Sequence, residues 1–131
     1  KVYEHHFSER VNSAEKGRIL KTLFQDHERN LLTKLLEWLQ QREDIFIVGP
    51  DDPELRVPTV SIVPKKKSID EIFAVLTEKK LMAGQGHFYG ARPLMGMKIP
   101  MDTGVLRLSF LHYTIEDEIN KLIDGLSAAL G

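Results

Sequence analysis

A long apolar stripe near the start of the chain constrains its fold more than any other feature. Between residues 17 and 42, large apolar residues recur three and four positions apart, as on one face of an α-helix. They are Leu20, Leu23, Phe24, Leu31, Leu32, Leu35, Leu36, Trp38 and Leu39. A helix of this extent is about 39 Å long. Because a stripe this broad needs more than a small sheet to cover it, we expect part of it to stay uncovered within this chain.

Short segments rich in strand-forming residues follow this helix. They predict strands at residues 45–48, 57–63 and 105–111, with a further short strand at 81–83. A second helix is predicted at 69–80, opened by a capping box of Ser68 and Glu71. A last helix to residue 130 is predicted to open in the same way, with Thr114 and Asp117. Residues 1–12 show no period and are predicted to be a connecting segment, and residues 84–104 a loop.

The order of these elements predicts an α+β fold. We expect a small, mostly antiparallel sheet with the long N-terminal helix, the middle helix and the C-terminal helix packed on one face. The chain has 131 residues, of which 42% are hydrophobic and 28% are charged, as expected for a single domain over 1–131. No apolar run is long enough to cross a bilayer and no cleavable signal is present, so we expect a cytoplasmic protein without a membrane partner.

Charge and composition exclude several classes of function. The formal net charge is −1, so no basic surface is available for nucleic acid. The chain has no cysteine, which excludes disulfides, thiolate zinc sites, iron–sulfur clusters and a cysteine nucleophile. Its five histidines do not stand at ligand spacing with carboxylates, so no metal site is predicted. The glycine-rich stretch 84–90 is not followed by a helical period, which argues against a phosphate-binding loop.

Arg107 is the most unusual residue of the predicted strands. It stands inside the alternating strand 105–111, where most sequences place an apolar or small polar residue. One interpretation is a salt bridge at a sheet edge. The other is a guanidinium that a rigid strand directs at a ligand carboxylate, since planar bidentate pairing favours Arg over Lys. The residues alone leave both interpretations open.

Several motifs together resemble one enzyme family. Residues 105–113, VLRLSFLHY, and the acidic helix start at 116–119 resemble the C-terminal signature of class V aminotransferases. These are fold-type I enzymes dependent on pyridoxal phosphate (PLP), and they include cysteine desulfurases and selenocysteine lyases. The resemblance also rests on His27-Glu28, Gly49-Pro50, residues 56–60 and the loop Gly86-His87-Phe88-Tyr89, which is similar to that of a cysteine desulfurase-like subfamily. It extends from about residue 18 to residue 130.

The resemblance implies that residues 13–131 are the C-terminal small domain of a larger enzyme, a transferase or lyase. A large domain outside this chain would hold PLP on a lysine, so we expect no PLP on this chain alone and no activity without that domain. The start at Lys1, within a polar segment that lacks an initiator Met, agrees with this expectation. The resemblance further implies an amino-acid substrate and a homodimeric enzyme. By motif match, Arg107 is similar to the arginine that binds the substrate α-carboxylate.

The sequence departs from the family pattern in the loop 86–92. Cysteine desulfurases carry their sulfur-accepting thiol here, whereas this chain reads HFYGAR over residues 87–92. The missing thiolate argues against a persulfide mechanism. His87 and Tyr89 are candidates for contacts with substrate or with the cofactor phosphate, with loop packing as the alternative. No residue of the chain is assigned a catalytic role.

Two other functions are compatible with the same residues. The first is a free-standing α+β module that binds a small carboxylate ligand through Arg107 and regulates a partner. The second is a protein-interaction domain that uses the long helix. In the first of these alternatives Arg107 still binds the carboxylate.

Overall fold

The computed structural model describes all residues from Lys1 to Gly131. Its elements are α1 (Val2–His6), α2 (Ser13–Gln40), β1 (Ile45–Val48), the 3₁₀ turn η1 (Pro53–Leu55), β2 (Thr59–Pro64), α3 (Ile69–Glu78), β3 (Gly84–Gly86), α4 (Ala91–Gly96), β4 (Val105–Ser109) and α5 (Glu116–Leu130). The predicted α+β class is confirmed. β1 has the predicted bounds, and the boundaries of α2, β2 and β4 differ from the predicted ones by a few residues.

The four strands form one antiparallel sheet in the order β1-β2-β4-β3. β4 is therefore an internal strand, bonded to β2 on one side and to β3 on the other. Side chains alternate between the two faces of a strand. Leu106 and Leu108 point to one face and are fully buried, so Val105 and Arg107 point to the opposite face.

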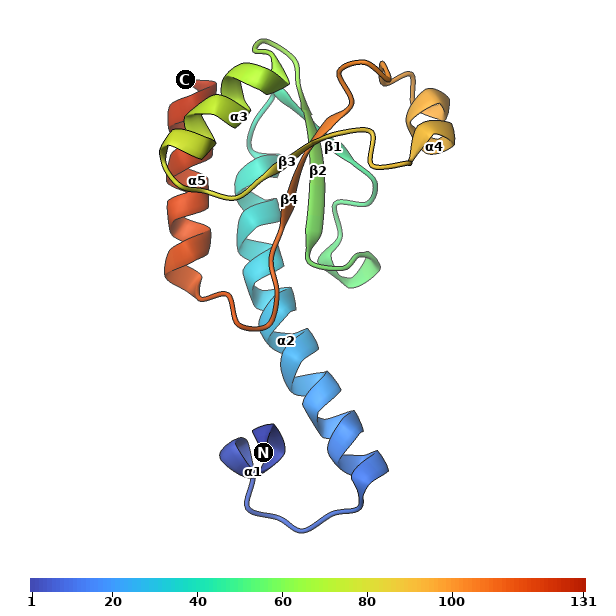
Figure 1. The fold of residues 1–131 in the computed structure, drawn as a ribbon, viewed down its shortest axis with the longest axis vertical. Helices are drawn as coiled ribbons and strands as arrows, with labels where there is room; N and C mark the ends of the chain where they lie inside the picture. The colour runs from blue at the N-terminus through green and yellow to red at the C-terminus, as the bar shows by residue number, and fades with distance from the viewer.

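The helices α2, α3 and α5 cover the face of the sheet that carries Leu106 and Leu108, as predicted (Figure 1). They form one core of 19 buried residues with the sheet. Fully buried members include Leu35 and Leu36 of α2, Ile72 of α3 and Leu126 of α5. Each such side chain contributes roughly 1.5–3 kcal/mol through burial.

A second, smaller cluster lies on the other face of the sheet. Leu94 of α4 packs there with Ile99 and Val105, and the half-buried Val48, Val63, Phe88 and Met101 surround them. Figure 1 shows α4 on the side of the sheet away from α3 and α5. The prediction of a loop over residues 84–104 is therefore wrong in part, because this segment contains β3 and α4.

The short third strand lies three residues later than predicted, at Gly84–Gly86 instead of 81–83. Residues 81–83 follow the C-terminal cap of α3 and belong to no helix or strand. Lys80 is left-handed (φ +59°), and the N–H of Leu81 donates to the Leu76 carbonyl at 2.8 Å, which closes the helix with a Schellman motif. Glycine is disfavoured in strands, so propensity gave no signal for the true position of β3.

The start of α5 also differs from the prediction. The Thr114 hydroxyl accepts a hydrogen bond from the N–H of Leu111 (3.2 Å) and does not cap the helix. The first residue outside the helix is Ile115, whose N–H donates to the Glu118 carboxylate at 2.9 Å. His27 Nε2 of α2 donates to the Thr114 carbonyl oxygen at 2.7 Å and ties this turn to the long helix.

The N-terminal half of α2 extends beyond the sheet (Figure 1). Its apolar residues Ile19, Leu20, Leu23 and Phe24 are half-buried and belong to neither core cluster. A shallow groove beside them is lined in part by Phe7, Ile19 and Leu23. The stripe is thus covered only in part by the sheet, as its length predicts.

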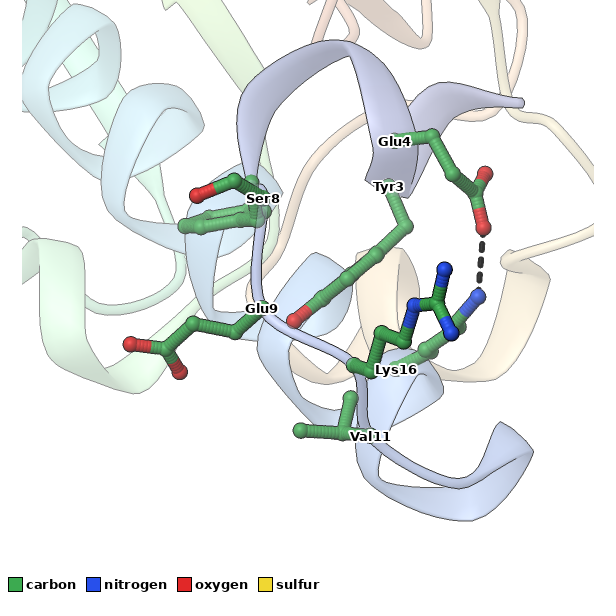
Figure 2. A pocket seen from close by; sticks show the side chains of 8 residues that line it. Tyr3, Glu4, Ser8, Glu9, Val11 and Lys16 are labelled. Atoms are coloured by element: carbon green, nitrogen blue, oxygen red, sulfur yellow. Dashed lines mark hydrogen bonds and ion pairs between the residues drawn. The ribbon is translucent and has the colours of Figure 1, made fainter.

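The segment predicted as a connection contains the short helix α1, which folds back against the start of α2. Tyr3 is 3% exposed, stacks on Phe7 (ring centroids 5.1 Å apart) and lies under the Lys16 ammonium group. Figure 2 shows the ion pair between Glu4 and Lys16 beside Tyr3. These contacts hold α1 against the first turn of α2.

The predicted capping box at the start of α3 is present and gives a direct test of local stability. The Ser68 hydroxyl accepts from the N–H of Glu71, and the Glu71 carboxylate accepts from the N–H of Ser68. We expect Ser68→Ala to lower the free energy of unfolding by about 1 kcal/mol, measured by urea denaturation. Ser127→Ala, at an exposed position within α5, is the matched control and should change stability by less than about 0.5 kcal/mol. Equal effects of the two substitutions would contradict the role of the cap.

Candidate functional site

The site is built around Arg107, in the middle of β4. The strand register places Ser61 of β2 on one side of Arg107 and Gly84 of β3 on the other. Ser61 in turn pairs with Val48 of β1. Because its two neighbours in this row are a serine and a glycine, no large side chain flanks Arg107 across the sheet. The side chains of the neighbouring strands therefore leave space beside the guanidinium on this face, and the Phe88 ring fills the part of it at Gly84.

The structure excludes one of the two sequence-based interpretations of Arg107. β4 is internal, so the residue does not lie at a sheet edge. No ion pair includes Arg107. No side-chain hydrogen bond includes it either. The half-buried guanidinium thus keeps its N–H donors unused within this chain, and the salt-bridge interpretation is wrong.

One face of the guanidinium is covered by the ring of Phe88. The Arg107 Cζ atom lies 3.8 Å from the ring centroid, which is a close cation–π stack. Such contacts contribute about 0.5–2 kcal/mol, depending on how far water is excluded. Gly84 makes room for the ring: a Cβ atom there would lie 2.9 Å from Phe88 Cζ and 3.2 Å from Cε1. The glycine in β3 is therefore a requirement of the Arg107–Phe88 contact.

A tight turn over residues 87–90 positions the Phe88 ring. The N–H of Gly90 donates to the His87 carbonyl at 2.7 Å, and both central residues are left-handed, Phe88 with φ +47° and Tyr89 with φ +60°. This is the pattern of a type I′ turn, in which Asn and Gly are normally found. A left-handed residue other than glycine costs about 1–3 kcal/mol, and such strain is concentrated at functional sites.

His87 and Tyr89, the other two candidate residues, flank Phe88 in the same turn. The His87 Nδ1 atom accepts a hydrogen bond from the N–H of Tyr89 at 3.1 Å, so this nitrogen is used within the loop. The Tyr89 side chain is 98% exposed and projects into solvent. The contact with Arg107 is made by Phe88, which sequence reasoning did not assign to the site. A glycine within a strand indicates that another group approaches the backbone closely. Only the three-dimensional structure shows that at Gly84 this group is the Phe88 ring.

Two pieces of the family motif have a structural role near the turn that follows β1. The Arg56 guanidinium donates to the carbonyls of Val48 (3.1 Å) and Pro50 (2.5 Å), and burial lowers the pKa of this arginine from its usual value. Gly49 of the same turn is left-handed, with φ +87°. Arg56 and the Gly49-Pro50 pair thus fix the end of β1, which pairs with the strand next to β4.

Other features of the chain supply no further site chemistry. The structure contains no group of three or more His, Cys, Asp or Glu side chains that could hold a metal ion. No helix has the length and apolar character needed to span a membrane. The hollow lined by Tyr3, Glu4 and Lys16 (Figure 2) lies beside α1, at the end of the molecule away from the sheet.

The fold and this arginine site define a small α+β domain, and comparison with known proteins gives its family. Residues 17–122 match the family model described as Aminotransferase class-V. The chain therefore belongs to the class-V aminotransferase family, a family of PLP-dependent enzymes.

Two curated relatives agree with this assignment. The Aminotransferase-like protein FGM3 of Gibberella zeae is 32% identical over 109 residues, which are 80% of this chain and 27% of the relative. The Probable cysteine desulfurase 2 of Mycobacterium leprae is 32% identical over 104 residues, 79% of this chain and 24% of the relative. The chain thus spans about a quarter of the length of the curated relatives it matches.

Solved structures show the same fold. The apo cysteine desulfurase of Thermococcus onnurineus superimposes with a TM-score of 0.77 at 20% identity, covering 89% of this chain and 28% of that one. The cysteine desulfurase CsdA of Escherichia coli gives a TM-score of 0.68 at 19% identity, covering 81% and 25%.

The lysines of this chain all lie at least partly exposed. A Schiff base requires a lysine within a binding pocket, and no lysine of the chain is buried. Lys16 and Lys34 pair with Glu4 and Glu116 at the surface, and the Lys67 ammonium group donates to the Ala129 carbonyl. The chain thus presents one arginine without an ion-pair partner in the middle of its sheet and no buried lysine.

Gly104, just before β4, tests the close backbone approach that places β3 beside Arg107. It is left-handed (φ +64°), and a Cβ atom there would lie 2.3 Å from the carbonyl carbon of Gly86. We expect Gly104→Ala to lower the free energy of unfolding by more than about 1 kcal/mol in urea denaturation. Gly96→Ala is the matched control, since a Cβ there meets nothing within 4 Å. A Gly104→Ala variant as stable as the control would contradict the observed approach of β3 and β4.

Proposed function

We propose that this chain is the C-terminal small domain of a PLP-dependent class V enzyme, called here the parent enzyme. In it, Arg107 binds the α-carboxylate of the amino-acid substrate, and the loop 86–92 closes the active site. One observation supports the proposal: an internal strand presents a half-buried guanidinium that forms no ion pair within the chain. The motif resemblance implies that this residue is similar to the carboxylate-binding arginine of the family.

The proposed role follows from the chemistry of the guanidinium group. Its planar fork forms two parallel N–H···O bonds with a carboxylate, which fixes both the position and the orientation of the ligand. Bound PLP supplies the electron sink for reactions at the substrate Cα. The contribution of Arg107 is to hold the substrate so that the bond to be broken has a fixed direction, and such positioning lowers reaction barriers by several kcal/mol.

The loop 86–92 distinguishes this proposal from sulfur transfer through a protein persulfide. The chain has no cysteine, so no residue of this domain can accept sulfur as a thiolate does. In its place the turn carries His87 and the fully exposed Tyr89, which we propose as contacts to substrate or to the cofactor phosphate in the closed enzyme. The chain supplies no residue for the chemical step itself.

The proposal includes the assembly that the family resemblance implies. The parent enzyme is a cytoplasmic homodimer, and its PLP-binding large domain covers the half-buried apolar residues at the start of α2. These residues, Ile19, Leu20, Leu23 and Phe24, pack into neither core cluster of the present structure, which supports a further contact surface.

Replacing the arginine in the parent enzyme tests the carboxylate role. We expect Arg107→Gln to raise KM for the amino-acid substrate about a hundredfold, because truncating one partner of a desolvated charge pair costs about 2–5 kcal/mol. Steady-state kinetics measure KM, and the PLP absorption spectrum verifies that cofactor content is unchanged. Arg10→Gln, an exposed arginine near the N-terminus without an ion pair, is the control. An unchanged KM in Arg107→Gln would overturn the proposal.

The isolated chain provides a second test, which also separates the alternative of a free-standing module. Mixed with PLP and L-alanine, the 131-residue chain should give no turnover above the rate of the same mixture without protein. Its affinity for L-alanine, measured by calorimetry, should be weaker than millimolar, since most of the binding surface belongs to the large domain. Turnover, or micromolar binding of L-alanine by the isolated chain, would contradict the proposed function; the second result would support the carboxylate-binding module.

A further inference from the structure

We propose that Phe88 is a positioning residue for Arg107: its ring fixes the guanidinium so that the free N–H edge meets the ligand carboxylate. This inference rests on the proposed function of Arg107 and adds a residue to it. It is carried by the contact of 3.8 Å between the Arg107 Cζ atom and the ring centroid.

A ring holds an arginine in a way that an acidic residue cannot. A neighbouring carboxylate would fix the guanidinium by occupying its N–H donors, and a substrate carboxylate would then have to displace it. The Phe88 ring contacts only the flat face of the group, and no ion pair includes Arg107. The side chain is therefore oriented while its donors remain unused, which is the requirement for a preorganised carboxylate site.

The surroundings of the ring serve this one contact. Gly84 leaves the space into which the ring fits, since a Cβ atom there would lie 2.9 Å from Phe88 Cζ. The turn 87–90 holds Phe88 and Tyr89 in left-handed conformations that other residue types adopt more readily. The strained turn thus places an aromatic ring against a glycine, directly over the arginine of the adjacent strand.

The geometry also sets the approach of the ligand. With one face of the guanidinium covered by Phe88, a carboxylate forms its two hydrogen bonds in the guanidinium plane. The open position next to Arg107 is that of Ser61, whose small side chain does not block that plane, whereas the Phe88 ring occupies the space at Gly84. The ligand carboxylate therefore lies roughly parallel to the ring.

Phe88 also packs beside the small cluster of Leu94, Ile99 and Val105, so its positioning role must be separated from simple packing. Phe88→Leu keeps an apolar side chain but removes the ring face, and Phe88→Tyr restores the face. Gly84→Ala leaves Phe88 itself intact and displaces its ring. Phe46→Leu makes the same chemical change at an aromatic residue of the edge strand β1 that is 45% exposed, and serves as the control.

The first measurement is the Nε–H signal of Arg107 in the NMR spectrum of the 131-residue chain. Stacking predicts an upfield ring-current shift of this signal in the wild type, in Phe88→Tyr and in Phe46→Leu. The shift should be lost in Phe88→Leu and in Gly84→Ala. A signal in Phe88→Leu at the wild-type position would overturn the inference, whatever the function of Arg107.

The second measurement separates this inference from the proposed function. In the parent enzyme we expect Phe88→Leu to raise KM for the amino-acid substrate about tenfold with kcat nearly unchanged, and Phe88→Tyr to restore KM. Loss of packing alone would lower the amount of active enzyme and leave KM unchanged. If Arg107→Gln raises KM and Phe88→Leu does not, the inference on Phe88 is overturned and the carboxylate role stands. If Arg107→Gln has no effect on KM, the proposed function itself fails.

Discussion

The burial of Leu106 and Leu108 beneath α2, α3 and α5 is the constraint on which the rest of the structure depends. Both side chains are fully buried, and they come from an internal strand with partners on both sides. Because strand side chains alternate, this burial sends Arg107 to the other face. A register shift of one residue would bury the guanidinium without a partner, at a large cost in free energy. The hydrophobic core therefore positions the polar site.

On that second face, the site combines an unpaired cation with an aromatic ring and a strained turn. The ring orients the Arg107 guanidinium without occupying its donors, and Gly84 provides the space for the ring. Conformational strain in the turn 87–90 is compatible with a stable fold because the large core on the opposite face is independent of it. This separation of the core face from the face of Arg107 agrees with the proposed role of the domain in closing an active site.

The elements with strong periodic signals were predictable from the sequence. The stripe of α2, the capping box at Ser68 and the apolar face of α5 depend on local spacing, and all three are present. β3 was predicted three residues too early because glycine-rich segments carry no strand signal, and α4 was missed because a helix of six residues is too short to show a period. The cap of α5 was misassigned because the Thr114 hydroxyl bonds to a preceding N–H instead of to the helix.

The candidate site, like the fold, was predictable from the sequence only in part. Arg107 was identifiable as unusual from its strand alone, and the family resemblance gave it a role. Whether it formed an internal salt bridge depended on the position of β4 within the sheet, which spacing does not specify. Phe88 was not assigned to the site because its contact with Arg107 depends on the pairing of Gly84 with Arg107. These two residues are far apart in the chain. Contacts that depend on cross-strand register require the three-dimensional structure.

The most direct test of the central claim is a crystal structure of the parent enzyme with an amino-acid substrate or inhibitor bound. The account predicts that both α-carboxylate oxygens lie about 2.7–2.9 Å from guanidinium nitrogens of Arg107, in the plane of that group. The Phe88 ring should remain stacked on its far face. A carboxylate bound by other residues, with Arg107 paired to a protein carboxylate or turned to solvent, would contradict the account.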